Sequence, residues 1–365
     1  MSKIRIAIDR GGTFTDCIGN PGTGKPQDDV VIKLLSVDPK NYPDAPLEGI
    51  RRLLEIFQKK KISRGVPLDL SDVESLRMGT TLATNCALER NGERCVFVTT
   101  KGFKDCLLIG DQTRPRIFEL AIKRPDPLYD VVIEVDERVT LEDFSEDPEN
   151  VKSQPSANEG VIVGKSGEIV RVLRKPDIST LRTALEAAFA QGIRSVGIAL
   201  LHSYTFPEHE ELVAALASEV GFTHVSLSSQ VSPMIKYLPR ANSAIADAYL
   251  TPVIQKYLSG MQAGLINTDN TNIQFMQSDG GLVEGSKFSG LKSILSGPAG
   301  GVVGYSATCY DPVTKIPLVG FDMGGTSTDV SRYGDGKLDH VFETTTAGIV
   351  IQSPQLDINT VAAGG

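Results

Sequence analysis

Tryptophan is absent from the 365 residues, and only four histidines and five cysteines are present. The cysteines form no C-x-x-C pair, so the sequence contains no zinc or redox motif of that kind. Their odd number does not suggest a disulfide framework. The histidines form no H-E-x-x-H, and no G-x-S-x-G segment accompanies them. The sequence therefore gives no support to zinc-protease or covalent-hydrolase chemistry.

Long apolar runs and a surplus of positive charge are also missing. No run of 18 apolar residues occurs, and the amino terminus MSKIRIAID lacks the apolar core of a signal peptide. We therefore expect no membrane partner and a cytoplasmic location. Lysine and arginine number 37 against 45 aspartates and glutamates, a net charge of −8. Because binding to a nucleic-acid backbone requires a basic surface, no nucleic-acid partner is expected.

Glycine is abundant, and two of its clusters lie in DRGGTFTDCIGNPGTGKP, residues 9–26. The second cluster, Gly19 to Lys25, has the glycine spacing of a P-loop, but Pro26 occupies the position of the hydroxyl that would bind magnesium. The residues that follow, QDDVVIKLLSV, predict a strand rather than a helix whose free N–H groups could bind phosphate. We predict a Pro/Gly turn here.

The first cluster has a second copy near the end of the chain. IAIDRGGTFTDC at residues 6–17 and VGFDMGGTSTDV at residues 319–330 align at a constant offset of 313 residues (322 − 9). Each copy follows an apolar segment that predicts a strand. Two units of one design suggest related lobes whose turns face a shared cleft. The matching residues are Asp9, Gly11, Gly12, Thr13, Thr15 and Asp16 in the first copy and Asp322, Gly324, Gly325, Thr326, Thr328 and Asp329 in the second.

The groups in these turns suit a polyphosphate ligand. Glycine turns expose N–H donors, threonine hydroxyls add others, and phosphate oxygens accept from both. The carboxylates that end the two strands, Asp9 and Asp322, can hold Mg²⁺ directly or through its waters. Alternatively both aspartates only cap turns, which explains one copy but gives no reason for two. Asp16 and Asp329 are candidates for orienting a hydroxyl or a water molecule.

These repeated elements resemble the phosphate-1 and phosphate-2 motifs of the actin-like ATPase superfamily. Within it the chain is similar to the hydantoinase A/5-oxoprolinase family, most of all to the eukaryotic-type 5-oxoprolinase branch. The resemblance implies an α/β fold, the actin-like (ribonuclease H-like) ATPase architecture with two related lobes. The further segments that carry it are KLLSVDPKNYPDAPLEGIRRLLE, RMGTTLATNCALERNGE, VTTKGFKDCLLIGDQTRP, YDVVIEVDERV and ILSGPAGGVVG.

The resemblance also implies an activity, that of an ATP-dependent cyclic amide hydrolase. Its substrate would be 5-oxoproline, and its cofactors would be ATP and Mg²⁺, with a monovalent cation such as K⁺. Phosphorylation of the amide oxygen would activate a lactam that otherwise resists attack by water. An N-methylhydantoinase, a ketone carboxylase subunit, a small-molecule kinase and a nucleotide-dependent regulatory module remain alternatives. The full-length form is expected to be a homo-oligomer.

By the same resemblance, residues 1–228 form a hydantoinase/oxoprolinase N-terminal domain and residues 229–365 the start of a hydantoinase A domain. The second domain is expected to carry a connecting helix near residues 297–309 before the second phosphate motif. Members of the family continue far beyond the position of Gly365. We therefore expect the second lobe to be incomplete, the adenine-binding residues to lie outside this chain, and the chain alone to turn over its substrate weakly or not at all.

Four residues are candidates for contacts with the substrate. Thr80 and Thr81 form a Gly-Thr-Thr turn before a predicted helix, where hydroxyls and free N–H groups can bind a carboxylate or phosphate. Capping of that helix explains them equally well. Arg114 and Arg240 could bind the substrate carboxylate, because guanidinium binds carboxylate through two parallel hydrogen bonds. Surface ion pairs are the alternative for both.

The rest of the chain shows alternating strand and helix signals, clearest between residues 169 and 227, as in an α/β protein. An amphipathic helix is predicted over residues 46–60. A longer helix is predicted over about residues 240–265, with an interruption at Pro252. The acidic, proline-bearing residues 142–160 predict a surface loop.

Overall fold

The computed structural model describes residues 3–111, 118–121, 125–142, 160–325, 327–346, 348–361 and 363. By its internal contacts the chain divides into two compact units. Unit 1 comprises residues 1–89, 253–342 and 354–365, and unit 2 comprises residues 90–252 and 343–353. Both units are therefore discontinuous in the sequence. The division into the segments 1–228 and 229–365 concerns family domains and stays a prediction.

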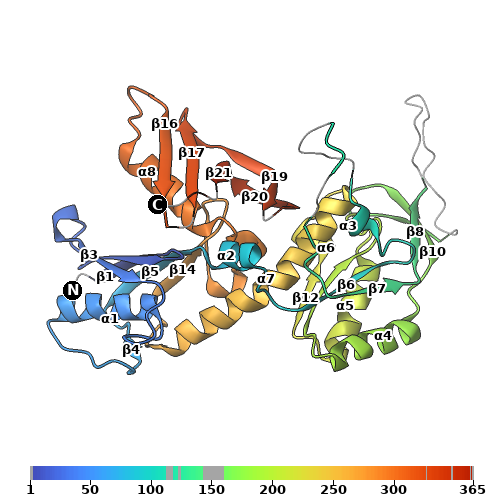
Figure 1. The fold of residues 1–365 in the computed structure, drawn as a ribbon, viewed down its shortest axis with the longest axis horizontal. Coiled ribbons are helices and arrows are strands. Elements are labelled where there is room, and N and C mark those ends of the chain that lie inside the picture. Colours follow the sequence, from blue (N-terminus) through green and yellow to red (C-terminus); the bar gives the residue numbers. More distant parts are fainter. Residues whose placement is uncertain are drawn as a thin grey trace. The chain divides into compact units, whose positions relative to one another are not determined.

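A six-stranded sheet is the centre of unit 1, with the strand order β15-β14-β5-β1-β2-β3 (Figure 1). The first three strands of the chain form antiparallel neighbours, whereas β5 and β14 run parallel to β1. Alternate residues of β1 are buried, as the period of two predicts for a half-buried strand. The strands are β1 (Ile4–Arg10), β2 (Phe14–Asn20), β3 (Val30–Leu35), β5 (Val73–Thr80), β14 (Asn272–Met276) and β15 (Leu282–Val283).

Helix α1 (Ala45–Gln58) packs against β1, β2 and β3, which confirms the helix predicted over residues 46–60. The Asp44 carboxylate caps its first turn by accepting the Leu47 N–H at 2.8 Å. The helix approaches the sheet closely because residue 49 is glycine. A Cβ added at Gly49 would lie 2.2 Å from the Cys17 sulfur.

The second glycine cluster forms the loop between β2 and β3. The Asn20 side-chain oxygen accepts the N–H groups of Gly22 and Gly24, and both glycines have positive φ. A short 3₁₀ turn, η1 (Pro26–Asp28), then leads into β3. In the described chain the cluster is thus a turn that leads through η1 into a strand, and the predicted Pro/Gly turn is confirmed.

Unit 1 contains a second sheet, which includes the second copy of the repeat. Helix α8 (Ser296–Cys309) contacts β1, β5 and β14 of the first sheet and β16 and β17 of the second. Its small residues permit these contacts, and its position confirms the helix expected near residues 297–309. The strands of the second sheet are β16 (Leu318–Met323), β17 (Thr328–Gly334), β18 (Lys337–Leu338) and β21 (Ile358–Val361).

Unit 2 is built on a parallel sheet with the strand order β12-β11-β6-β7. Helices α4 (Ile178–Ala190) and α5 (Glu208–Val220) join the strands in one apolar core. The alternation predicted between residues 169 and 227 is therefore confirmed. The strands are β6 (Cys95–Thr100), β7 (Val131–Val135), β11 (Ser195–Ala199) and β12 (His224–Leu227).

Helix α7 (Tyr237–Ala263) is continuous through Pro252, so the interruption expected from the sequence is wrong. Proline has no N–H to donate to the carbonyl of the residue four positions earlier, here Ala248. The buried Ser195 hydroxyl donates to that carbonyl instead, at 2.6 Å. The predicted surface loop at residues 142–160 lies almost entirely outside the described residues, since 143–159 are not among them.

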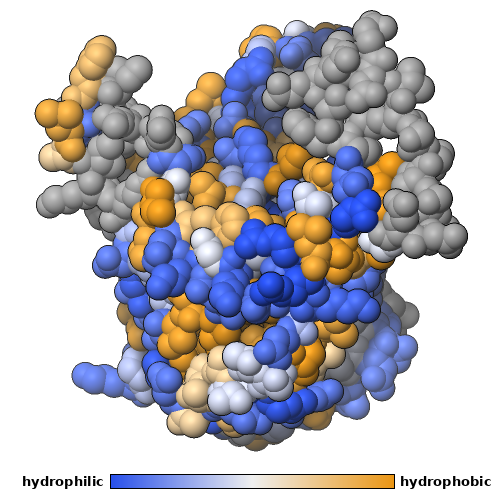
Figure 2. Space-filling view, turned by 90° about the vertical axis from the view of Figure 1, so that its right-hand side faces the viewer, coloured by the Kyte–Doolittle hydropathy of each residue, from blue (hydrophilic) through white to orange (hydrophobic). Residues whose placement is uncertain are grey.

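The remaining elements are short. Within the described ranges, no helix is long and apolar enough to cross a membrane. On the face of the molecule shown in Figure 2, hydrophobic residues are interspersed among hydrophilic ones. The elements are β4 (Leu68–Asp69), α2 (Leu82–Glu89), α3 (Cys106–Ile109), β8 (Arg138–Leu141), β9 (Val161–Val163), β10 (Ile169–Arg174), α6 (Ser228–Val231), β13 (Leu265–Ile266), η2 (Gly285–Lys287), η3 (Leu291–Ser293), β19 (His340–Thr346) and β20 (Ile349–Leu356).

Candidate functional site

The two copies of the repeat form hairpins with the same strand register. Asp9 of β1 faces Asp16 of β2, and Asp322 of β16 faces Asp329 of β17. Each turn is closed by the same hydrogen bond, since the N–H of Gly11 or Gly324 donates to the carbonyl three residues later at 2.9 Å. The offset of 313 residues thus holds for strand pairing and turn geometry. The sequence repeat is a structural repeat.

The two turns are neighbours within unit 1. A Cβ added at Gly325, in the second turn, would lie 2.7 Å from the hydroxyl oxygen of Thr13, in the first. Glycine at position 325 is what permits this approach. Thr326, the counterpart of Thr13, lies outside the described residues.

Asp9 lies where the first turn, β5 and the start of α8 meet. Its side chain keeps access to solvent, yet protein surrounds it: Cβ atoms added at Gly79 and Gly297 would lie 3.6 and 3.5 Å from the Asp9 Oδ1. Burial raises the pKa of Asp9 to about 6, and the negative charges of Asp322 and Asp16 add to that rise. Asp9 and Asp322 therefore act on each other electrostatically.

The aspartates opposite Asp9 and Asp322 have different partners in the two copies. Asp16 forms an ion pair with Lys33 of β3 at 2.8 Å. Asp329 instead accepts a hydrogen bond from the Thr360 hydroxyl of β21 at 2.6 Å. Burial raises the pKa of Asp329, and the charge of Asp322 raises it as well, although the Thr360 bond opposes this rise. Among the described residues, Asp16 thus has a cation as its partner and Asp329 a hydroxyl.

A groove of about 410 Å³ lies beside the second hairpin. Asp322 and Asp329 line it together with residues of α8, among them Gly301 and Tyr305. The Tyr305 hydroxyl lies 3.0 Å from the Ser331 hydroxyl, which faces the same side of β17 as Asp329. This groove therefore combines two carboxylates with hydroxyl groups and an open helix surface.

Thr80 and Thr81 lie at the carboxyl end of β5, beside the end of β1. Thr80 is 1% exposed, and its hydroxyl accepts the Leu82 N–H at 3.1 Å, which makes it a cap of α2. Its own N–H donates to the Ser296 hydroxyl at 3.1 Å. Thr81 remains half-buried next to Gly297, which also lies beside Asp9, so of the two threonines only Thr81 has a partly exposed side chain near that carboxylate.

The hydroxyls of Thr15 and Thr328 were expected to face a phosphate, but in the structure both bond to neighbouring protein segments. Thr15 is fully buried and its hydroxyl lies 2.9 Å from that of Ser36. The buried Thr328 hydroxyl donates to the carbonyl of Ala363 at 2.6 Å. Successive residues of a strand point to opposite faces, so these threonines point away from the face that carries Asp16 and Asp329. Both hold neighbouring chain segments in place.

Ser36 directly follows β3 and contacts the first turn, which the motif did not reveal. Its N–H donates to the Thr13 carbonyl at 2.9 Å, and its hydroxyl donates to the Gly11 carbonyl at 2.7 Å. Because that hydroxyl has only one hydrogen, Thr15 must be the donor in the contact between the two side chains. Ser36 therefore fixes the path of the turn from the strand next to it.

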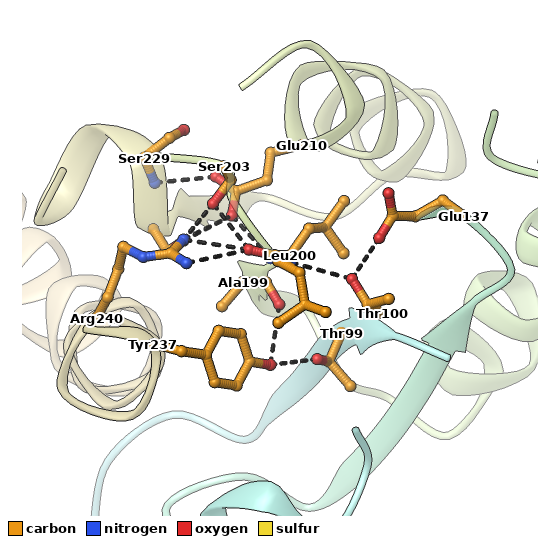
Figure 3. A network of polar contacts seen from close by, with 12 residues as sticks. Thr99, Thr100, Glu137, Ala199, Leu200, Ser203, Glu210, Ser229, Tyr237 and Arg240 are labelled. Carbon is orange, nitrogen blue, oxygen red and sulfur yellow. Dashed lines mark hydrogen bonds and ion pairs between the residues drawn. The ribbon is translucent and has the colours of Figure 1, made fainter. Parts of the chain in front are cut away.

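Arg240 is a buried structural residue of unit 2, so its predicted role in binding a substrate carboxylate is wrong for this structure (Figure 3). The side chain is 1% exposed, and its guanidinium donates to the Ser228 hydroxyl at 2.6 Å, to the Leu200 carbonyl at 3.2 Å, and to Ser203. The Glu210 carboxylate balances its charge at 3.9 Å. The other predicted arginine, Arg114, lies outside the described residues.

The carboxylates of the repeat fit a metal that is shared with a ligand better than one held by protein alone. In the described part of the chain, no group of three or more His, Cys, Asp or Glu side chains could hold a metal ion. Mg²⁺ usually keeps several waters and is held by one or two carboxylates together with phosphate oxygens. Asp9 and Asp322, placed on adjacent turns rich in N–H groups, match that donor set.

Comparisons with known proteins agree with these features. Residues 5–221 match the model of the hydantoinase/oxoprolinase N-terminal region, and residues 240–365 match the hydantoinase/oxoprolinase model. The chain is 74% identical over 363 residues to 5-oxoprolinase of Saccharomyces cerevisiae and 54% identical over 368 residues to 5-oxoprolinase 1 of Arabidopsis thaliana. Each alignment covers 100% of this chain but 28% of the relative. The chain thus spans little more than a quarter of the length of these relatives.

Two solved structures share the fold. Acetone carboxylase in a nucleotide-free state matches with a TM-score of 0.73 at 20% identity, over 100% of this chain and 48% of that one. The ATP-dependent caprolactamase of Pseudomonas jessenii matches with a TM-score of 0.73 at 22% identity, over 99% and 48% respectively. At such identities the likeness shows the mixed α/β fold alone. The two family models together cover most of the sequence, and the chain belongs to the hydantoinase/oxoprolinase family.

Proposed function

We propose that this chain is the N-terminal segment of an ATP-dependent 5-oxoprolinase, which opens 5-oxo-L-proline to L-glutamate while ATP is cleaved to ADP and phosphate. The observation that carries the nucleotide part is the contact between the two turns at Thr13 and Gly325. The 74% identity to yeast 5-oxoprolinase supports the substrate. A fold neighbour whose title names an ATP-dependent caprolactamase supports the pairing of ATP with a cyclic amide.

In this proposal the turns bind the phosphates of ATP. The N–H groups of Gly12, Gly325 and their neighbours and the Thr13 hydroxyl are donors for phosphate oxygens. Asp9 and Asp322 would hold Mg²⁺, which when bound supplies positive charge to those oxygens. Thr15 and Thr328 act indirectly, because their hydroxyls hold the strands beside the turns.

The chemistry overcomes the stability of the amide. The lactam oxygen attacks the γ-phosphorus of ATP, the bond between the γ-phosphorus and the bridging oxygen breaks, and ADP leaves. One water adds to the activated ring carbon, and the bond from that carbon to nitrogen breaks to leave an acyl phosphate. A second water releases phosphate and glutamate. Asp329, with its raised pKa and its hydroxyl partner, is a candidate for accepting a proton from an attacking water.

The test is release of ADP and glutamate from ATP and 5-oxoproline by the natural polypeptide that carries this segment. We expect Asp9→Asn and Asp322→Asn each to lower turnover at least 100-fold, as loss of a group that stabilises the transferring phosphoryl does. The control is Asp335→Asn at an exposed turn between β17 and β18. Unchanged rates in both site variants would remove the metal assignment.

The products also separate this function from its relatives. A kinase of the same fold would keep a phosphorylated product, whereas 5-oxoprolinase releases free phosphate in equal amount with glutamate. ATP cleavage that depends on a ketone or a hydantoin but not on 5-oxoproline would refute the substrate and leave the nucleotide site intact.

A further inference from the structure

Unit 2 contains a cavity of about 730 Å³ that none of the residues of the phosphate turns line. Its walls come from α3 and the residues after it, from the segment before β7, from the first turns of α7 and from the hairpin of β19 and β20. Ligand sites for small molecules commonly measure several hundred Å³ and combine apolar walls with a few polar groups. The apolar part of this lining includes Leu107, Leu108, Ile245, Ile349 and Val350.

The cavity adjoins the point of the parallel sheet where such folds bind ligands. From β6 the chain continues to β7 on one side, while β11, on the other side of β6, is followed by β12. The strand order therefore reverses between β6 and β11, and ligands of open α/β sheets bind beyond the carboxyl ends of the strands at such a reversal. Tyr237, which lines the cavity, bridges these ends, because its hydroxyl contacts Thr99 and the Ala199 carbonyl (Figure 3).

Neutral polar groups without partners lie in the cavity wall. The Asn242 amide, on α7, is half-buried and has no hydrogen-bond partner among the described residues. The hydroxyls of Tyr129 and Thr344 are buried and likewise lack a partner in the described structure. A buried hydroxyl without a partner destabilises the fold. A small movement of either side chain toward the cavity would let its contents supply the missing bond.

Among the described residues that line this cavity, Lys236 is the one cation. Lys236 forms an ion pair with Glu343 at 3.2 Å, and its side chain is 65% exposed. Exposed pairs of this kind contribute little to stability, so a ligand carboxylate can replace Glu343 at little cost.

We propose that this cavity binds a small cyclic amide, with the Asn242 amide paired to the amide of the ring and Lys236 facing a carboxylate on it. A lactam of five or six atoms holds its amide cis, so its C=O and N–H lie side by side. A primary amide offers the complementary N–H and C=O in the same spacing. The apolar walls receive the methylene groups of the ring.

The inference rests on the proposed function, and it adds the site at which that enzyme holds its substrate. The site lies within unit 2 alone. The phosphate turns belong to unit 1.

Binding to the 365-residue chain tests the inference, by calorimetry and ligand-observed NMR with three probes. These probes are 5-oxoproline, 2-pyrrolidinone, and N-methyl-2-pyrrolidinone, which lacks the ring N–H. We expect the chain to bind 2-pyrrolidinone at least 10-fold more tightly than the N-methyl compound.

Asn242→Leu should weaken the binding of 5-oxoproline and of 2-pyrrolidinone at least 10-fold and abolish this preference. Lys236→Met should weaken 5-oxoproline alone, and Lys256→Met, on the exposed side of the same helix, should change nothing.

Thermal unfolding of each variant separates lost binding from lost folding, and Thr344→Val gives a second variant of nearly unchanged shape. Binding that is equal in all variants, absent in the unaltered chain, or removed by Asp9→Asn instead would overturn the cavity assignment. Those results would contradict the cavity assignment but not the proposed turnover of 5-oxoproline by the natural polypeptide. Conversely, if the natural polypeptide does not turn over 5-oxoproline, the proposed function is wrong. The binding of 2-pyrrolidinone would still test the cavity assignment in that case.

Discussion

Thr13 occupies the space that a side chain at Gly325 would need. The hydroxyl oxygen of Thr13 lies 2.7 Å from the position of an added Cβ, closer than real Cβ atoms approach other atoms. These residues are 312 positions apart (325 − 13), on turns with the same register and the same closing hydrogen bond. Contact between two copies of one turn is what a shared phosphate site requires.

Gly325→Ala should therefore disrupt the junction of the turns. Overpacking of this kind costs about 1–3 kcal/mol, and we expect the free energy of unfolding to fall by that amount and ATP binding to weaken at least 10-fold. Denaturant unfolding and calorimetry with Mg·ATP measure the two effects. Gly304→Ala on α8, where an added Cβ meets no atom within 4 Å, should instead be neutral or stabilise the chain by about 1 kcal/mol.

The contact itself can be tested by combining Gly325→Ala with Thr13→Ala. Removal of the Thr13 hydroxyl frees the space, so the double variant should recover about 1 kcal/mol or more of unfolding free energy relative to the sum of the single changes. Strict additivity would show that the two turns do not touch in solution.

The raised pKa of Asp9 predicts a pH dependence of stability. Folding raises this pKa from 3.8 to about 6, so the folded chain binds the proton more tightly than the unfolded chain. Ionisation of Asp9 therefore lowers stability progressively from about pH 4 to pH 6, and the full cost is present above that range. Because Asp9 keeps solvent access, we expect a cost on the order of 1 kcal/mol.

Asp9→Asn should accordingly be more stable than the unaltered chain at pH 7 and equal to it at pH 4, as measured by urea unfolding. The same carboxylate must be ionised to hold a metal, so Mg·ATP binding should weaken as the pH falls from 7 to 5. Asp335→Asn, at an exposed turn, serves as the matched control for the loss of one carboxylate. A constant difference between Asp9→Asn and the unaltered chain would contradict the assignment.

The sequence predicted a strand and a glycine turn in each copy of the repeat, but neither the strand register nor what surrounds the turns. A Gly-Gly turn and the period of a strand are local features, whereas the pairing of Asp9 with Asp16 and of Asp322 with Asp329 comes from the structure. Lys33 and Ser36 reach the first turn through β3 and the residue after it, and no motif joins them to it. For Thr15 a signal was present, because it alternates with Asp16 and shares its face with Cys17, which is buried.

Arg240 should prove essential to stability. Arg240→Met leaves the Glu210 carboxylate buried without its cation, and breaking a buried pair in this way costs about 3–5 kcal/mol. Arg182→Met removes a comparable pair with Glu219, but one that is exposed, and should cost less than about 1 kcal/mol. Urea unfolding of both variants measures the contrast. If Arg240→Met left stability intact and weakened lactam binding, a substrate role would have to be restored.

The long helix shows why a local rule can fail. Proline inside a helix removes one donor, and from the sequence alone that loss predicts an interruption at Pro252. The donor that replaces it, Ser195, is 57 residues away (252 − 195) at the start of β11. Only the packing of the helix on the sheet brings that hydroxyl to the freed carbonyl of Ala248.

The replacement bond between Ser195 and Ala248 gives a prediction in which a destabilising change is rescued by removal of a proline. Ser195→Ala leaves the buried Ala248 carbonyl with no partner and should lower the free energy of unfolding by about 1–3 kcal/mol. In Ser195→Ala/Pro252→Ala the new N–H at position 252 can donate to that carbonyl within the helix, so most of the loss should return. Pro252→Ala alone should have a smaller effect, since the Ala248 carbonyl can accept two hydrogen bonds.

Guanidinium unfolding of the unaltered chain, the two single variants and the double variant measures these effects. Ser218→Ala on α5 is the control, because the Ser218 hydroxyl also bonds to a helix carbonyl but is exposed. Additive effects of the two changes would mean that Pro252 is accommodated without help from Ser195.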